Sequence, residues 1–262
     1  MTVLPPGTIL QLLYLKERLS ETAPGRFIEI GPGSGEITRL LLSAGWVGTS
    51  YDIEEKTIVG IQKRFAEEIA EKRFCAVNAD YLATDIGSTS VDLVISCMVM
   101  EHLKEDQQKV FMAKSAGALK KRGLMIGLVP SSPAHWGIED EIAGHYRRYT
   151  KEKLAALLDE CNWDLLHIAG LTFPTSNLLL SISNYLVERS ERSKLALSMS
   201  AKTKSSGQRR VRFKTYFPAL MGMLLNTRTL LPLHFIQKMF LNSNRAMVLY
   251  FEAKHCAEAI KT

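Results

Sequence analysis

The sequence predicts an α/β protein in which a largely parallel β-sheet is covered by helices. Strand and helix patterns alternate from Arg26 to about Val129, as expected for parallel strands joined by helical crossovers. The 262 residues are 46% hydrophobic and 23% charged, the composition of a folded globular chain. This length is enough for one large core, or for one core with a modest appendage.

The individual elements follow from local signals. An amphipathic helix is expected first, over Thr8 to Leu19, and Ser34 is the expected N-cap of the next helix. Further helices are expected over 55–72 and 105–121, with Gly123 stopping the second of these. The strands expected in this part of the chain are 27–30, 45–51, 74–77, 91–96 and 124–129.

The pattern changes beyond Thr150. A helix is expected over 151–160, a strand over 163–173 and the last strand over 245–251. The roughly 70 residues between those two strands are too long for an ordinary loop and must carry structure of their own. Helices are expected near 178–186 and over 218–240, broken near Pro232, with 201–210 as a mobile tether.

Charge separates this intervening segment from the rest of the chain. Residues 175–243 contain 11 Lys and Arg against 2 acidic residues, a net charge of +9, whereas the whole chain carries +6. We therefore expect a core made of 1–174 and 244–262, and a basic helical insertion over 175–243.

Cysteine usage and terminal patterns restrict the class of protein. The four cysteines form no C-x-x-C pair, which argues against a zinc site and a disulfide framework and fits a reducing compartment. The N-terminus lacks the features of a signal peptide, and no apolar run is long enough for a bilayer. The expected location is cytoplasmic, with peripheral membrane contact left open.

The glycines Gly31, Gly33 and Gly35 directly follow the first expected strand. Such a turn lets a ligand approach the backbone amides at the start of a helix. A dinucleotide-binding turn has its third glycine one place later, where this chain has Glu36. Because a carboxylate there would repel a pyrophosphate, the spacing favours a phosphate-free nucleoside and argues against an NAD-linked dehydrogenase.

Two carboxylates follow the next two strands. Asp52 is placed to accept the hydroxyls of a ribose, and Asp80 to accept the exocyclic amine of adenine. Either one alone is explained as well by a turn or a helix cap. Their occurrence at successive strand ends favours a single adenosine site, because the carboxyl ends of parallel strands converge.

Four motifs together resemble the class I S-adenosylmethionine (SAM)-dependent methyltransferases of the small-molecule branch. They are Phe27-Ile28-Glu29-Ile30-Gly31-Pro32-Gly33-Ser34-Gly35, Tyr51-Asp52-Ile53-Glu54-Glu55, Asn78-Ala79-Asp80-Tyr81 and the run from Val91 to Leu103. The resemblance covers about 26–173 and the closing strand. It implies a Rossmann-like, doubly wound sheet of about seven strands with the last antiparallel, and SAM as the cofactor.

The resemblance also assigns roles to single residues. Glu29 is implied to help hold the methionine amino group, and Ile53 and Tyr81 to flank the adenine. Cys97 is implied to flank the methionine part, with a small buried hydrophobe as the equal alternative. In this family the residue corresponding to His102 generally opens the helix after the fourth strand, which favours a structural role.

A second informative stretch is 130–150, which follows the fifth strand. Its run Gly144 to Thr150 resembles a segment of bacterial methyltransferases that act on secondary metabolites, sugars or lipid-like molecules. His145 is the candidate general base or substrate ligand, the alternative being that it orients the loop through Asp140. Thr150 is the expected N-cap of the next helix. The substrate-binding candidates are His135, Tyr146, Arg148 and Tyr149.

The predicted function is methyl transfer from SAM to a small-molecule, sugar or lipid-like acceptor by in-line displacement. The alternatives are a non-catalytic SAM-binding scaffold and a methyltransferase acting on a macromolecule. No metal is expected, since the Asp, Asp-Asn set of the magnesium-dependent branch is absent. The sequence does not fix the oligomeric state.

The insertion has three interpretations: a cap over the acceptor, a shallow contact with a membrane surface, or a helical elaboration with a solvated basic face. Phe213, Tyr216 and Phe217 near Arg209, Arg210 and Arg212 keep nucleic-acid binding open. No recognised nucleic-acid module accompanies them, which argues against that partner.

Overall fold

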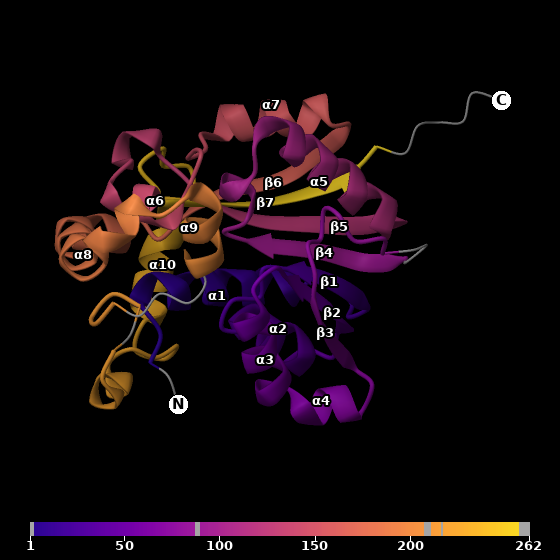
Figure 1. The fold of residues 1–262 in the computed structure, drawn as a ribbon, viewed down its shortest axis with the longest axis horizontal. Helices are drawn as coiled ribbons and strands as arrows, with labels where there is room; N and C mark the ends of the chain where they lie inside the picture. The colour runs from indigo at the N-terminus through magenta and orange to yellow at the C-terminus, as the bar shows by residue number, and fades with distance from the viewer. Residues whose placement is uncertain (1–2, 87–89, 207–210, 216, 257–262) are drawn as a thin grey trace. The chain divides into compact units, whose positions relative to one another are not determined.

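The computed structural model contains a seven-stranded sheet in the order β3-β2-β1-β4-β5-β7-β6 (Figure 1). The structure describes residues 3–86, 90–206, 211–215 and 217–256. Strands β1 to β5 pair in parallel, and the last strand is antiparallel, as the sequence predicts. The strands are β1 (Arg26–Ile30), β2 (Val47–Asp52), β3 (Phe74–Asn78), β4 (Val91–Cys97), β5 (Leu119–Pro130), β6 (Trp163–Leu171) and β7 (Val248–His255).

Ten α-helices and four 3-10 helices are found among the described residues. The α-helices are α1 (Pro6–Leu19), α2 (Glu36–Ser43), α3 (Glu55–Arg64), α4 (Ala66–Ala70), α5 (Glu105–Ala118), α6 (Ile138–Ala143), α7 (Lys151–Glu160), α8 (Thr175–Glu191), α9 (Met199–Ser206) and α10 (Leu231–Met239). The 3-10 helices are η1 (Met100–His102), η2 (Pro133–His135), η3 (Arg192–Ala196) and η4 (Ala219–Met223). None of the helices in these ranges combines the length and the apolar content needed to cross a bilayer.

The chain divides into two compact units. The first comprises Met1–Ala23, Pro130–Arg148 and Ala169–Leu249, and the second comprises Pro24–Val129, Tyr149–Ile168 and Tyr250–Thr262. The first unit therefore contains the insertion together with α1 and the segment that follows β5. The second contains β1 to β4 with their helices.

The second unit has a core built on the central strands. Leu93, Val94 and Ile95 of β4 are all fully buried, as expected for a parallel strand whose two faces are both covered. The carboxyl ends of the strands lie level with one another, since Ile30 pairs with Tyr51 and Asp52 pairs with Asn78. This register brings the residues that follow β1, β2 and β3 to a common edge.

The first unit has its own buried contacts. Ile142 of α6, Val187 of α8 and Val211 form a small core. The side chain of Gln237 on α10 donates to the carbonyl of Leu10 on α1, and its amide oxygen accepts from the backbone of Thr172. The insertion is therefore tied by hydrogen bonds to the N-terminal helix.

Several local predictions differ from the structure. The N-cap of α2 is Gly35 and not Ser34, because the backbone there has φ of +80°, which glycine adopts without strain. Gly123 lies inside β5 and does not stop α5, which already ends at Ala118. Pro232 is the second residue of α10 and does not break it, since proline is tolerated in the first helical turn.

The expected tether over 201–210 is helical in its first part. Residues up to Ser206 belong to α9, which packs on α6. Residues 207–210 and 216 lie outside the described residues, and with them Arg209, Arg210 and Tyr216 of the nucleic-acid alternative.

Candidate active site

The glycine turn after β1 has the conformation that its sequence requires. Gly31, Gly33 and Gly35 have φ of +71°, +52° and +80°, in the left-handed region that side chains disfavour. A Cβ at Gly35 would clash with Ile61 and Phe65, so that glycine is needed for packing. A Cβ at Gly33 would meet nothing within 4 Å. The backbone of Gly33 therefore borders open space in which a ligand can lie against it.

Glu29 lies buried on β1, just before the turn. One of its carboxylate oxygens accepts hydrogen bonds from the hydroxyls of Thr38, at 2.5 Å, and Ser50, at 2.7 Å. Burial raises the pKa of Glu29 to about 7, against the lowering effect of these hydrogen bonds. Its protonation state is therefore balanced near neutral pH, and a cation beside it would ionise it.

Asp52 ends β2 at the same edge, and Ile53 follows it. One carboxylate oxygen of Asp52 accepts from the backbone N–H of Glu54 at 2.8 Å, which fixes the side chain in a turn. Burial raises the pKa of Asp52 above its ordinary value. The Ile53 side chain is exposed although it is apolar. A carboxylate beside an exposed apolar side chain suits a ribose and an adenine ring.

Asp80 follows β3 at the level of Asp52, where the carbonyl of Asp52 accepts from the backbone of Ala79. The Asp80 side chain is exposed and accepts from the backbone of Leu82 at 2.9 Å. The ring of Tyr81 is buried between Tyr51 and Phe111, with centroids 5.8 Å from each. Asp80 thus stands at the open edge, whereas the Tyr81 ring belongs to the core beneath it.

Glu36, which occupies the position of the third dinucleotide glycine, is paired with cations. Its carboxylate lies 2.8 Å from the guanidinium of Arg64 and also contacts Arg39. Arg64 donates in addition to the carbonyl of Ser34. The negative charge at this helix start is therefore compensated, so the argument against a pyrophosphate now rests on the glycine spacing.

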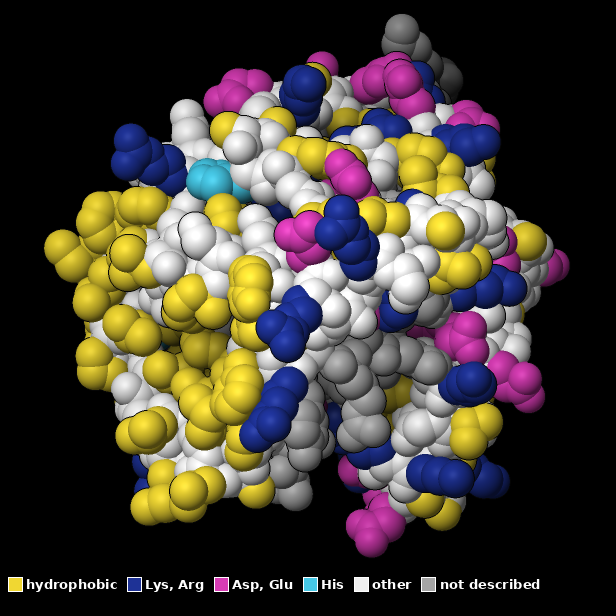
Figure 2. Space-filling model, turned by 60° about the vertical axis from the view of Figure 1, so that its left-hand side comes forward, with side chains coloured by type: hydrophobic (Ala, Val, Ile, Leu, Met, Phe, Trp, Pro, Cys, Tyr) yellow, Lys and Arg dark blue, Asp and Glu magenta, His cyan; other side chains and the backbone are white. Residues whose placement is uncertain are grey.

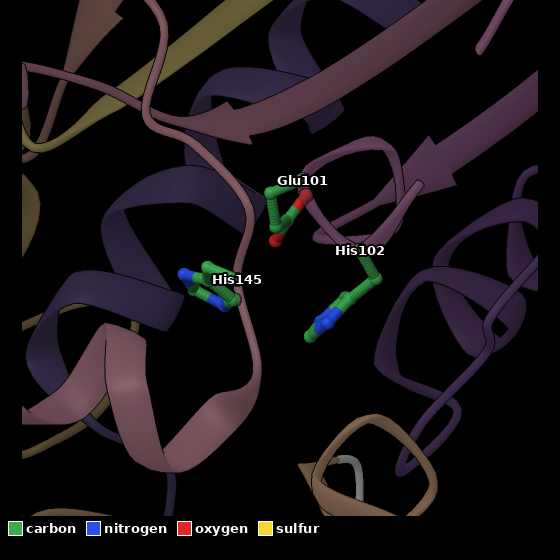
Figure 3. A group of neighbouring side chains, drawn as sticks. All are labelled: Glu101, His102 and His145. Carbon is green, nitrogen blue, oxygen red and sulfur yellow. The ribbon is translucent and has the colours of Figure 1, made fainter. Parts of the chain in front are cut away.

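Cys97 and the turn after β4 complete this edge of the second unit. Burial, and then the charges of Glu101 and Glu29, raise the pKa of the Cys97 thiol to about 12. The thiol is thus protonated at neutral pH and serves as a small apolar surface, not as a nucleophile. Glu101 and His102 lie on η1 (Figure 3), with ligand atoms within 4.8 Å of each other. His102 is the last residue of η1, and α5 begins three residues later at Glu105.

His145 follows α6 in the first unit (Figure 3) and belongs to a hydrogen-bonded group. Its Nδ1 lies 2.8 Å from a carboxylate oxygen of Asp140, which is completely buried. Asp140 also accepts from Nε of Arg148, at 2.8 and 3.0 Å, and from the backbone of Gly137. Burial alone would raise the pKa of Asp140, but its contacts with His145 and Arg148 outweigh this and lower it. An ionised Asp140 has no proton to donate, so Nδ1 of His145 is the donor in this contact.

The remaining substrate-binding candidates are placed differently from one another. Arg148 is buried, with its second donor on the carbonyl of Ser131, and Tyr149 is buried with its hydroxyl on the carbonyl of Met100. Their polar atoms are thus engaged within the protein. Tyr146 is exposed, and His135 is half-buried with Nδ1 2.7 Å from the Ser132 hydroxyl. Thr150 caps α7 by accepting from the backbone of Lys153, as predicted.

Sequence reasoning missed the residues that hold these groups. Thr38 and Ser50 were not singled out, although Glu29 in an otherwise apolar strand requires buried hydrogen-bond partners. Ser50 stands opposite Glu29 in the parallel register, so strand alignment would have indicated it. Arg148 was expected to bind substrate; in the structure its Nε donates to the buried carboxylate of Asp140.

Comparisons with known proteins point to one family. A family model described as a methyltransferase domain matches residues 9–168, more than half of the chain. An uncharacterized methyltransferase of Bacillus cereus is 32% identical over 102 residues, which are 39% of this chain and 45% of that protein. The matched region thus spans less than half the length of this curated relative.

Two solved structures show the same fold. A putative methyltransferase from Bacillus halodurans C-125 aligns with a TM-score of 0.58 and 13% identity, over 94% of this chain and 99% of that one. The 1,6-didemethyltoxoflavin-N1-methyltransferase of Burkholderia thailandensis, with bound 1,6-didemethyltoxoflavin and S-adenosylhomocysteine, aligns with a TM-score of 0.51 and 19% identity. That second alignment covers 64% of this chain and 73% of the other.

The family match includes the glycine turn and both strand-end aspartates, and the strand order is the one that the resemblance predicts. The chain therefore belongs to the methyltransferase-domain family, as a class I SAM-dependent methyltransferase.

Proposed function

We propose that this chain transfers the methyl group of SAM to a small-molecule, sugar or lipid-like acceptor. The observation that carries the proposal is the common edge of β1, β2 and β3, where Gly33, Asp52 and Asp80 follow strands that end level with one another. This edge offers bare backbone, a carboxylate for hydroxyls and a carboxylate for an amine. Those are the groups that the adenosine part of SAM requires.

The residues present fit this cofactor. Open space beside Gly33 leaves room at the backbone, and the exposed Ile53 offers an apolar surface for the adenine. Glu29 and Cys97 would face the methionine part, Glu29 through its ionisable carboxyl and Cys97 as a small neutral side chain. SAM supplies a methyl group already activated on a sulfonium sulfur, suited to in-line displacement. For this chain we retain Tyr81 as a residue that shapes the adenine side through its packing.

On the acceptor side we propose His145 as the base that removes a hydroxyl proton. Its Nδ1 is held by the ionised Asp140, so Nε2 carries the lone pair that a base needs. Asp140 and Arg148 are positioning residues, because they act through His145. The same arrangement occurs wherever a carboxylate fixes the tautomer of a catalytic histidine.

We assign acceptor contacts to His135 and Tyr146, whose side chains are at least partly accessible. For residues 175–243 we propose the role of a cap for the acceptor. The Burkholderia thailandensis enzyme acts on 1,6-didemethyltoxoflavin, which supports a small-molecule acceptor as the class to test first.

The test combines binding and turnover. Calorimetry should detect SAM binding to the native chain. When a lysate is divided into small-molecule, lipid, protein and nucleic-acid fractions, SAM labelled in its methyl group should label a component of the small-molecule or lipid fraction. Binding without transfer to any extract fraction would favour the non-catalytic scaffold. The proposal is wrong if no SAM binding is detected, or if label enters only nucleic acid or protein.

A further inference from the structure

The helix α8 buries polar side chains and exposes large apolar ones. The buried side of α8 includes a serine and a glutamate, whereas its exposed side carries four large apolar side chains together with Ser181, Glu188 and Arg189. The buried residues are Ser183, Val187 and Glu191. The exposed apolar residues are Leu178, Leu179, Ile182 and Tyr185. With 3.6 residues per turn the two sets lie on opposite sides of the helix, which is the reverse of a helix that only packs on a soluble core.

The helix α10 repeats this arrangement. Its buried side chains are His234 and Gln237, which hydrogen-bond to each other and to α1. Phe235 and Met239 are exposed, Met239 by 79%. Burying polar residues and exposing large apolar ones leaves unfavourable hydration in the isolated chain.

A third element adds to the same surface. On η4 and directly after it, Leu220, Met223 and Leu224 are 80%, 75% and 69% exposed. All three elements belong to the first unit. Figure 2 shows hydrophobic side chains gathered over the left-hand part of the face it displays. We call the exposed apolar residues of α8, η4 and α10 the apolar face.

Cations accompany the apolar face. Arg189 follows Tyr185 by one helical turn and its guanidinium lies 3.3 Å from the tyrosine hydroxyl. Arg192, at the end of α8, is exposed and lies 3.5 Å from the carboxylate of Glu188, and Arg228 is exposed before α10. The segment 175–243 carries +9. An apolar surface with a tyrosine and arginines at its border matches the boundary between acyl chains and anionic headgroups.

We propose that the apolar face docks this chain on an anionic lipid surface. The apolar side chains of α8, η4 and α10 enter the boundary of the acyl chains, and the arginines contact the headgroup phosphates. Charge complementarity selects lipid over a second copy of the chain, because two copies of this segment would each bring +9 to their interface. The inference goes beyond methyl transfer and holds whatever the acceptor is.

The experiment is co-sedimentation of the native chain with vesicles, without cofactor or acceptor. One set contains phosphatidylcholine alone, and the other contains about 30% phosphatidylglycerol. We expect binding to the anionic set, reduced when NaCl is raised from about 0.05 to about 0.5 M. The variant Ile182→Gln/Phe235→Gln/Met239→Gln should bind at least about tenfold less, since three apolar side chains no longer enter the lipid.

Control variants separate the surface from the fold. Val110→Gln and Leu166→Gln replace exposed apolar residues of the second unit and should leave vesicle binding unchanged. Glutamine keeps helix propensity, so the melting temperature of the triple variant should match the native value. The proposal is overturned if the native chain does not bind anionic vesicles, or binds both sets equally. It is overturned as well if ultracentrifugation shows a dimer that the triple variant dissociates while vesicles bind neither protein.

Discussion

Glu29 and Ser50 stand opposite each other on β1 and β2, and the serine hydroxyl donates to the buried carboxylate over 2.7 Å. Together with Thr38 this contact holds the carboxyl in one orientation. Burial nevertheless raises its pKa to about 7. A carboxyl with such a pKa is only partly ionised at neutral pH and responds to any cation placed beside it.

The first prediction is that SAM affinity rises with pH between about 6 and about 8, by up to tenfold, because only ionised Glu29 attracts the cationic methionine part. Calorimetry across this range checks it, and binding should release protons to the buffer. Glu29→Gln should bind more weakly at pH 8 and show a flatter profile. An identical pH profile in both proteins would remove Glu29 from the site.

The stability of the unliganded chain should show the opposite trend. A carboxyl whose pKa is raised on folding binds more protons in the folded state, so its contribution is fully present below the ordinary pKa of a glutamate and is lost as pH rises through about 7. Denaturant unfolding at a series of pH values measures this decline. In Glu29→Gln the decline over the same range should be smaller.

A second prediction compares two glycines at which an added Cβ atom would meet no neighbouring atom. A Cβ would meet nothing within 4 Å at Gly33 or at Gly60, but only Gly33 has a positive φ and borders the expected cofactor. Gly33→Ala should lower SAM affinity about tenfold or more, and Gly33→Val further, since the added atoms occupy the ligand's approach. Gly60→Ala, inside α3, should bind SAM normally and be slightly more stable. Equal affinities in the two alanine variants would contradict the placement of SAM at Gly33.

The third prediction concerns the ribose. Asp52→Ala should weaken SAM binding by about 1.5–3 kcal/mol, the usual loss for a hydrogen bond to a charged group. Asp159→Ala, which removes an exposed carboxylate from α7, provides the matched control and should leave calorimetric affinity unchanged. Unaltered affinity in Asp52→Ala would show that this carboxylate only shapes its turn.

The fourth prediction tests the base. His145→Ala should lower kcat about 100-fold or more, with SAM affinity nearly intact, and should abolish the acidic limb of the pH–rate profile. The rate of the native enzyme falls toward acidic pH because a protonated imidazole cannot accept the hydroxyl proton. A normal kcat in this variant would show that His145 is not the base and would leave it the role of orienting its loop through Asp140.

Asp140→Asn tests the partner of that histidine. It should lower kcat by favouring the wrong tautomer, and should also reduce stability because Arg148 loses its carboxylate. Its lowered pKa means that Asp140 stabilises the fold above the ordinary aspartate pKa, and that this contribution is lost as pH falls. Glu141→Gln, at the exposed neighbouring position, should change neither quantity.

The common edge formed by Gly33, Asp52 and Asp80 was predictable from the sequence because it depends on local signals in a fixed order. A glycine turn after one strand and an aspartate after each of the next two suffice, since parallel strands bring their carboxyl ends together. Strand ends shifted by a few residues, as in β7, without moving those groups. The expectation that 201–206 would form a tether was wrong because α9 is stabilised by packing on α6, which local propensity does not show.

The group around Asp140 was only partly predictable. The sequence indicated Asp140 as a partner of His145, five positions away, but Arg148 was interpreted as a substrate-binding residue. Nothing local shows that a buried carboxylate will need this cation, because that requirement follows from its burial in the folded chain. The exposure of the apolar side of α8 was not predictable for the same reason. Leucines at helical spacing normally indicate the face of a helix that is buried.

The last prediction concerns a shortened chain in which a Gly/Ser linker joins Phe173 to Asn244. The two ends of the insertion are close, because the backbone N–H of Gly170 donates to the carbonyl of Leu241 at 2.7 Å. Every residue expected at the cofactor belongs to the second unit, so SAM affinity should stay within about threefold of the native value. Methyl transfer should be lost if 175–243 caps the acceptor.

Deletion also removes Gln237, whose amide group bonds to Leu10 and Thr172, so the shortened chain should melt at a lower temperature. Gln237→Leu is the matched control, because it breaks the same hydrogen bonds and keeps the insertion. This variant should be destabilised by about 2–4 kcal/mol and yet transfer methyl groups well below its melting temperature. Efficient transfer by the shortened chain to the native acceptor would refute the cap. If the shortened chain and Gln237→Leu are both inactive, the loss of activity comes from the broken contact with α1 and not from the missing insertion.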